Sequence, residues 1–145
     1  MAVQSGGRHD RSRIGRQRQG LVVIRMAVGA MMLIHGVTRM SLGTVDDFGE
    51  FLGLRGFPVG VGVAVAVAWL LTAVEILGGA LLVLGRFVFP LALWFAAELT
   101  IGVILVHWTE GWFVVGAGRN GMEYSALLIV CFLAIAWAAR GEKRR

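Results

Sequence analysis

The sequence has few of the residues that keep a small domain folded in water. Only 16% of its 145 residues are charged, and it has a single cysteine, whereas about a quarter of a soluble domain is usually charged. One cysteine excludes an intrachain disulfide framework, and Cys131 lies inside an apolar run, where a buried thiol is expected. The sequence also lacks a glycine-rich phosphate loop, a nucleophile elbow and a CxxC pair. Familiar enzyme motifs are therefore missing.

Long apolar runs dominate instead, with hydrophobic residues making up 57% of the chain. A bilayer core needs about 20 helical residues, and four segments of that kind fit, at residues 20–38, 61–85, 87–108 and 122–139. A soluble helical bundle is disfavoured because these segments have almost no polar face. We predict an all-α membrane protein, with four transmembrane helices in an antiparallel bundle over residues 20–139. Basic tails flank it at residues 1–19 and 140–145.

Basic residues gather on one side of this predicted bundle. An even number of spans puts both tails on the same side. With the turn after the second span, that side carries ten basic residues: Arg8, Arg11, Arg13, Arg16, Arg18, Arg86, Arg140, Lys143, Arg144 and Arg145. The opposite loops carry three, Arg39, Arg55 and Arg119. The positive-inside bias then predicts that both termini lie in the cytoplasm. The basic arm is expected to touch anionic lipid headgroups rather than nucleic acid.

The first external loop, TVDDFGEFLGLRGFP, contains an amphipathic stretch. Thr44 and Asp47 have the spacing of a capping box. Phe48 and Leu52 then share one helical face, opposite Asp47 and Glu50. This pattern predicts a short interfacial helix on the outer surface.

Glu75 is the least expected residue, since it lies near the middle of the second span. A charge at that depth costs at least about 2.5–3.5 kcal/mol, so it should face the bundle. Arg25 in the first span lies about 7 Å from the inner edge and Glu75 about 15 Å, at 1.5 Å per residue. We predict that Arg25 and Glu75 form an intramembrane ion pair. The pair could fix only helix register, or it could serve proton or redox chemistry.

Glu98 is a second carboxyl group at mid-span. It could share a proton with Glu75 or bind a polar headgroup. Alternatively, it is neutral and hydrogen-bonded to a backbone carbonyl, which we slightly prefer.

A third polar set is expected near the outer face. His35, Arg39, His107 and Glu123 all lie near outer span ends. Two histidines and a glutamate could bind metal, but no HxxE or HxH spacing supports this. We therefore predict no metal site.

These residues together resemble the DoxX family of small bacterial four-helix membrane proteins. The resemblance runs from Arg25 to Trp137. Its motifs are Arg25 followed by His35-Gly36 and Arg39, then FLGLRGFP, EILGGALLVLGRF and GWFVVGAGRNGMEYSALL. Two positions depart from the pattern, because Arg39 replaces a usual lysine and Glu98 stands where an apolar or small residue is usual.

The resemblance implies a membrane subunit of a redox complex, linked to thiosulfate, thiols or oxidative stress. A quinone is the cofactor it suggests, none being expected to bind covalently, and soluble redox or sulfur-metabolism proteins are the implied partners. We expect a quinone-facing or scaffold subunit rather than an enzyme acting alone. A small proton- or solute-conducting subunit, which would need a homo-oligomer, and a purely structural membrane protein are the alternatives.

Overall fold

The computed structural model describes residues 5–55, 60–115 and 120–142, and within those ranges it contains helices and no strand. Residues 143–145 of the predicted C-terminal tail lie outside them. The helices are α1 (Ser5–Ser41), α2 (Val45–Leu54), α3 (Gly60–Val83), α4 (Val88–Gly102) and α5 (Glu123–Glu142). A π-helical turn, η1 (Val103–His107), and a 3₁₀ turn, η2 (Trp108–Glu110), continue α4.

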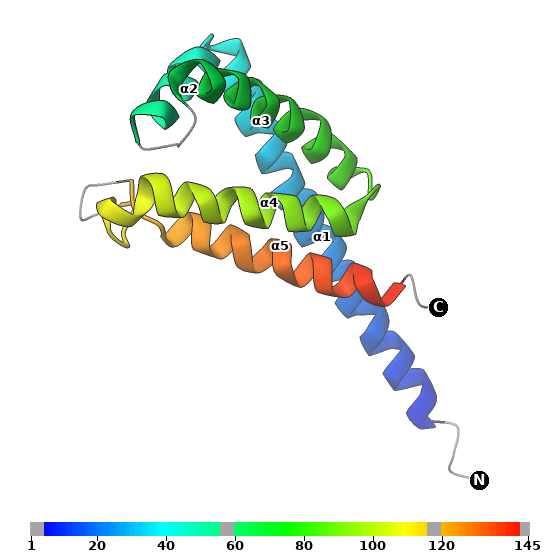
Figure 1. Cartoon of the computed structure of the whole chain (residues 1–145). Coiled ribbons are helices and arrows are strands. Elements are labelled where there is room, and N and C mark those ends of the chain that lie inside the picture. The colour runs from blue at the N-terminus through cyan, green and yellow to red at the C-terminus, as the bar shows by residue number, and fades with distance from the viewer. Residues whose placement is uncertain (1–4, 56–59, 116–119, 143–145) are drawn as a thin grey trace.

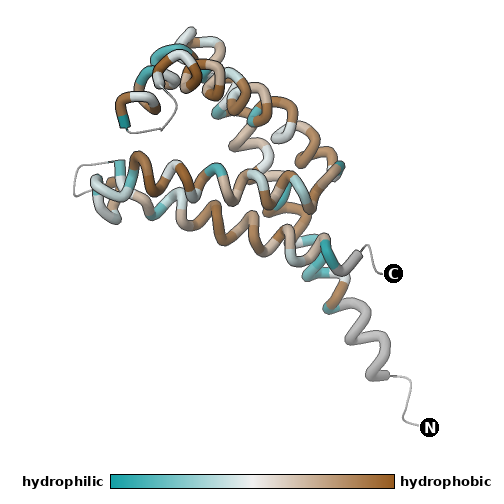
Figure 2. Tube along the Cα trace, viewed as in Figure 1, coloured by the Kyte–Doolittle hydropathy of each residue, from teal (hydrophilic) through white to brown (hydrophobic). Residues whose placement is uncertain are grey.

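Four of the described helical segments are long and apolar enough to cross a membrane: Arg13–Ser41, Gly60–Val83, Val88–Glu110 and Glu123–Arg140. Figure 2 shows them as mostly hydrophobic tubes with isolated hydrophilic positions. The predicted all-α membrane fold is therefore confirmed. The first span differs from the prediction, because α1 continues as helix through most of the basic segment before residue 20.

The helices form two groups, α1 with α2 and α3, and α4 with α5. The groups meet at the turn after α3 and diverge from it, as Figure 1 shows. The start of α1 and the end of α5 lie at the same end of the molecule, as an even number of spans requires.

Small residues let α1 and α3 approach closely. A methyl group added at Gly79 of α3 would lie 2.7 Å from the Leu33 backbone nitrogen and 2.8 Å from the Gly29 carbonyl oxygen of α1. At Gly36 the added group would lie 3.0 Å from the Thr72 carbonyl oxygen. These glycines therefore place the two backbones in contact, as small residues do in membrane helix pairs.

The short helix α2 folds back along the first half of α3. Trp69 donates its indole N–H to Asp46 at 2.7 Å, and Gly53 of α2 packs against Val61. Higher residue numbers in α2 thus meet lower ones in α3, so the two helices are antiparallel. Since α2 covers residues 61–69 of α3 and α1 covers residues 72–83, α1 ends halfway along α3.

The helix predicted in the first loop is present, but the predicted capping box is wrong. Thr44 is the N-cap residue of α2 without a side-chain cap hydrogen bond. Its hydroxyl instead donates to the Arg39 carbonyl oxygen at 3.3 Å. Thr44 therefore ties the end of α1 to the start of α2.

A buried aromatic pair joins α4 to α5. The Phe95 and Phe132 rings, from α4 and α5, have centroids 5.4 Å apart, and both side chains are fully buried. Gly78 of α3 admits the Phe95 ring, since an added methyl group there would lie 3.1 Å from its tip. The main core joins the two groups of helices, because it combines buried residues of α1 and α3 with buried residues of α4 and α5.

Candidate functional site

The best-defined polar site is an ion pair between α1 and α3. Arg39 donates from Nη1 to Glu75 Oε2 at 2.8 Å and from Nη2 to Glu75 Oε1 at 3.3 Å. The two side chains are 11% and 4% exposed. A two-point contact of this kind matches the guanidinium fork to the carboxylate and holds both side chains in one orientation.

Neighbouring side chains complete this site. Nη1 of Arg39 also donates to the Thr72 hydroxyl at 3.0 Å, and Thr72 donates in turn to the Ala68 carbonyl oxygen at 2.8 Å. The Phe48 ring of α2 lies over the guanidinium, with its centroid 4.1 Å from the Arg39 Cζ atom. Cation–π contact and hydrogen bonds thus replace the water that a buried guanidinium has lost.

The predicted pairing of Arg25 with Glu75 is wrong. Glu75 binds Arg39 instead, because α1 ends about halfway along α3. The prediction assumed that the first span crosses the whole bilayer and that Arg39 lies beyond it. In the structure α2 covers the first half of α3, so Arg39 lies level with Glu75.

Arg25 lies near the other end of α3. Its Nη2 is 3.5 Å from the Val83 carbonyl oxygen, and its guanidinium packs on Gly85. The last carbonyls of a helix lack intrahelical donors and carry partial negative charge, which a nearby cation stabilises. Gly85 adopts a φ of 74° and leaves room for the guanidinium. Arg25 therefore stabilises the C-terminal end of α3.

Glu98 lies on α4, across from this ion pair. Its Oε2 accepts the Trp94 indole N–H at 3.1 Å. The preferred expectation was a bond to a backbone carbonyl, and the structure shows this side-chain contact instead. Trp94 and Glu98 lie four residues apart, so the contact is made within α4.

The four residues predicted to form an outer polar cluster have separate surroundings. Arg39 binds Glu75, and the exposed His35 faces a pocket. His107 Nδ1 lies 2.7 Å from the Asn120 carbonyl oxygen, and Glu123 accepts the Val114 backbone N–H at 3.0 Å. Within the described ranges, no group of three or more potential metal ligands forms.

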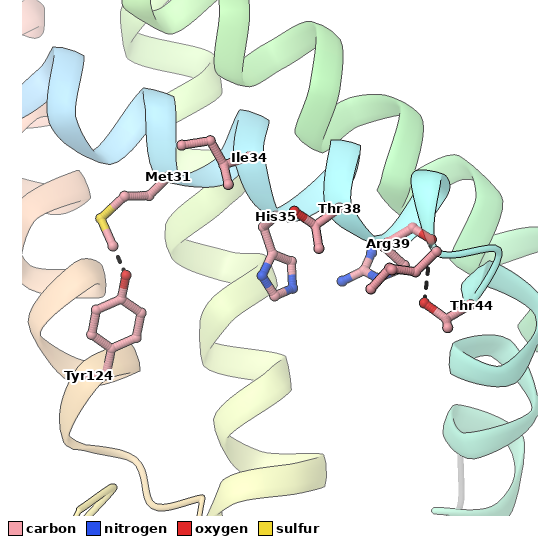
Figure 3. A pocket seen from close by; sticks show the side chains of 8 residues that line it. Met31, Ile34, His35, Thr38, Arg39, Thr44 and Tyr124 are labelled. Atoms are coloured by element: carbon pink, nitrogen blue, oxygen red, sulfur yellow. Dashed lines mark hydrogen bonds between the residues drawn. The ribbon is translucent and has the colours of Figure 1, made fainter.

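The pocket lies beside α1 and has a volume of about 510 Å³. Figure 3 shows His35 and Arg39 directed from α1 toward its interior, while Tyr124 of α5 approaches from the opposite side. The Tyr124 hydroxyl lies 3.2 Å from Met31 Sδ and links α5 to α1. The lining combines apolar and polar side chains: Met31, Ile34, His35, Thr38, Arg39, Leu42, Thr44 and Tyr124. We call it the α1 pocket.

Sequence reasoning missed the roles of Thr72, Phe48 and Trp94. Thr72 and Glu75 occupy adjacent positions on one face of α3, and both are buried, so their spacing carried a usable signal. Trp94 lies four residues before Glu98 on one face of α4, so its spacing carried a signal too. Phe48 carried none, because its role depends on how α2 folds back.

A family model described as DoxX matches residues 20–108, more than half of the chain. The match includes Arg39, Glu75 and Glu98. No curated protein and no solved structure is significantly similar to this sequence. The match and the four apolar helices agree with the resemblance drawn from the sequence motifs, and the chain belongs to the DoxX family of integral membrane proteins.

Proposed function

We propose that this protein is the membrane subunit of a redox complex and that its α1 pocket takes a quinone. The observation that carries the proposal is the composition of the pocket. Met31, Ile34 and Leu42 supply an apolar wall, and His35 and Arg39 supply hydrogen-bonding groups. A quinone headgroup is a flat apolar ring with two carbonyl acceptors, so its chemistry is complementary to this lining.

The size of the α1 pocket supports a ligand of that class. A volume of about 510 Å³ falls within the range of about 300–1,000 Å³ that is usual for small-molecule sites. Ile34 and Leu42 are 62% and 69% exposed on a membrane-spanning helix. A lipophilic ligand could therefore reach the pocket directly from the bilayer.

Arg39 has donors left for such a ligand. Of its five N–H groups, three are used by Thr72 and Glu75 among the described residues. The guanidinium is already held in place by Thr72, Glu75 and Phe48. Binding a ligand through its remaining N–H groups would therefore cost little side-chain entropy. Soluble partner proteins would supply the electrons, and the membrane subunit would supply the quinone.

Equilibrium binding of a radiolabelled short-chain benzoquinone to the purified protein in lipid nanodiscs tests this proposal. Ile34→Trp fills the pocket from its apolar wall and should reduce binding at least tenfold. Ile101→Trp is the matched control, because Ile101 is 52% exposed on α4 and outside the pocket. Equal binding by the two variants, or no saturable binding by the unmodified protein, would refute the quinone site.

Proton or polar-solute conduction is the second candidate, favoured by two carboxyl groups, those of Glu75 and Glu98, on membrane-spanning helices. Four helices enclose little space, so conduction would require an oligomer. Proteoliposomes loaded with a pH-sensitive dye distinguish the two functions. Proton flux abolished by Glu98→Gln supports conduction, whereas saturable quinone binding without flux supports the redox subunit.

We also propose that both termini face the cytoplasm of a bacterial inner membrane. Arg39 lies in α1 and binds Glu75, so the loops predicted on the outer side keep two basic residues, Arg55 and Arg119. This asymmetry supports the proposed orientation. A reporter fused to the C-terminus that is active only outside the cytoplasm would overturn this orientation.

A further inference from the structure

Tyr124 is the contribution of α5 to the lining of the α1 pocket. Figure 3 shows it on the side opposite His35 and Arg39, with its hydroxyl group directed at α1. That hydroxyl group lies 3.2 Å from Met31 Sδ. A thioether sulfur is only a weak acceptor, so a carbonyl oxygen brought into the pocket would be a better partner for the same O–H group. Tyr124 is therefore a hydrogen-bond donor that a ligand can recruit.

The loop before α5 fixes the place of this tyrosine. The Glu123 carboxyl group accepts the Val114 backbone N–H at 3.0 Å. The backbone N–H of Glu123 donates in turn to the Trp112 carbonyl oxygen at 3.0 Å. These hydrogen bonds hold the first residue of α5, so the Tyr124 side chain extends from a fixed backbone position. A donor positioned before binding costs a ligand little ordering entropy.

The donors at the two ends of the pocket are two helical turns of α1 apart. Met31, which marks the level of the Tyr124 hydroxyl group, and Arg39 are separated by eight residues of α1, or about 12 Å at 1.5 Å per residue. The two oxygens of a para-quinone point in opposite directions about 5 Å apart, and a hydrogen bond adds about 2.8 Å at each end, so the two donors should be about 11 Å apart. Tyr124 and Arg39 match that separation.

His35 lies midway between these two levels. It is one helical turn from Arg39, or about 6 Å. A donor at that distance is too close to Arg39 to bind the opposite oxygen of the same ring. The place of His35 suits contact with the ring itself, which leaves Tyr124 as the donor for the second oxygen.

We propose that Tyr124 is the second hydrogen-bonding residue of the α1 pocket and that it selects ligands with two opposed carbonyl groups. One carbonyl group accepts from Arg39 and the other from Tyr124, whose hydroxyl group exchanges the Met31 sulfur for the ligand oxygen. The inference rests on the proposed quinone site and narrows the ligand class to para-quinones.

Two ligands that differ in one carbonyl group test this selection by equilibrium binding to the protein in lipid nanodiscs. One is a short-chain para-benzoquinone, and the other is the matching cyclohexadienone, in which a dimethyl carbon replaces one carbonyl group. The para-quinone should bind more tightly by about threefold to tenfold, as expected for one additional hydrogen bond. Tyr124→Phe should reduce the ratio of the two affinities by the same factor, because it removes the hydrogen bond that the dienone cannot make.

Trp108→Phe is the matched control. It also removes the donor of an aromatic side chain, but at a 67% exposed position outside the pocket lining, so the ratio of affinities should stay unchanged. An unchanged ratio in Tyr124→Phe, or an equal loss of affinity for both ligands, would overturn the selection and leave the quinone site standing.

A spectroscopic signal separates ligand binding from a structural role. Tyr124 is the only tyrosine of the chain, so carbon-13 placed at tyrosine Cζ, which bears the hydroxyl group, reports on this residue alone. Its NMR signal should shift when the para-quinone binds and stay in place when the dienone binds. A tyrosine that only ties α5 to α1 would give the same signal with both ligands, which would overturn the proposal. No saturable binding of either ligand would instead refute the quinone site, and with it this selection.

Discussion

The contacts that α3 makes with α1 and with α4 differ in kind. Against α1, glycines bring backbone to backbone, and Gly79 leaves less than 3 Å for an added methyl group. Against α4, contact is concentrated near the connecting turn, where Phe95 fills the space beside Gly78, and the helices then diverge (Figure 1). The close α1–α3 contact holds Arg39 on Glu75, whereas the open α3–α4 contact leaves Glu98 half-buried.

This difference indicates how the protein combines a rigid ion pair with space for protons or ligands to enter. A buried ion pair needs good geometry to offset its desolvation cost, and closely packed backbones provide that geometry. A site that exchanges protons or ligands needs a less crowded side. The Arg39–Glu75 pair lies in the close α1–α3 contact, and Arg39 borders the α1 pocket.

Removing the main side chain of the α3–α4 contact should have the largest effect. Phe95→Ala should lower the free energy of unfolding by about 3–5 kcal/mol, because the fully buried ring leaves a cavity beside Gly78 and Phe132. Detergent-induced unfolding followed by circular dichroism measures the loss. Leu93 of α4 is 42% exposed, so Leu93→Ala should lower the free energy of unfolding much less. Equal losses would mean that this contact is not packed as described.

The close contact is tested by a single added methyl group. Gly79→Ala should cost about 1–3 kcal/mol, because its Cβ meets the backbone of α1, which cannot move aside cheaply. Gly62→Ala lies on the same helix with no neighbour within 4 Å and should be neutral or stabilising by up to about 1 kcal/mol. Thermal melting in detergent compares them. A Gly79→Ala melting temperature at or above that of Gly62→Ala would contradict the close approach.

A smaller effect should distinguish the attachment of α2 to α3. Trp69→Phe removes the hydrogen bond to Asp46, which is exposed and contributes about 0.5–1.5 kcal/mol. Hydrogen exchange of the α2 amides should accelerate while that of α5 stays unchanged. Trp137→Phe, at an 82% exposed position, is the control. Unchanged exchange in α2 would show that other contacts hold this helix.

The sequence was sufficient to predict the main helices, but it was insufficient to predict how far each helix extends along its neighbours. Apolar length identified the four spans, and amphipathic spacing identified α2. Glu75 and Glu98 were identified as mid-span carboxyl groups from the apolar runs around them. The π-helical turn at Val103–His107 left no signal that the hydropathy pattern could reveal.

The partner of Glu75 was missed for a physical reason. Counting residues from the ends of the spans assumes that every span crosses the full bilayer, and α1 does not cross the full length of α3. The fold-back of α2 depends on tertiary contacts such as Gly49 with Val65 and Trp69 with Asp46. The family motif of His35-Gly36 followed by Arg39 contained the correct arginine, but its depth could not be read from spacing.

The central claim is that Arg39, and not Arg25, is the partner of Glu75, and two double-mutant cycles in detergent micelles test it most directly. Arg39→Gln should cost about 3–5 kcal/mol because it leaves a buried carboxylate without its cation. Combined with Glu75→Gln, it should recover much of that loss, giving a coupling free energy of about 2–3 kcal/mol. In the second cycle, the losses in free energy of unfolding caused by Arg25→Gln and by Glu75→Gln should add to within about 0.5 kcal/mol. Strong coupling of Glu75 to Arg25, with additive losses for Arg39, would contradict the account.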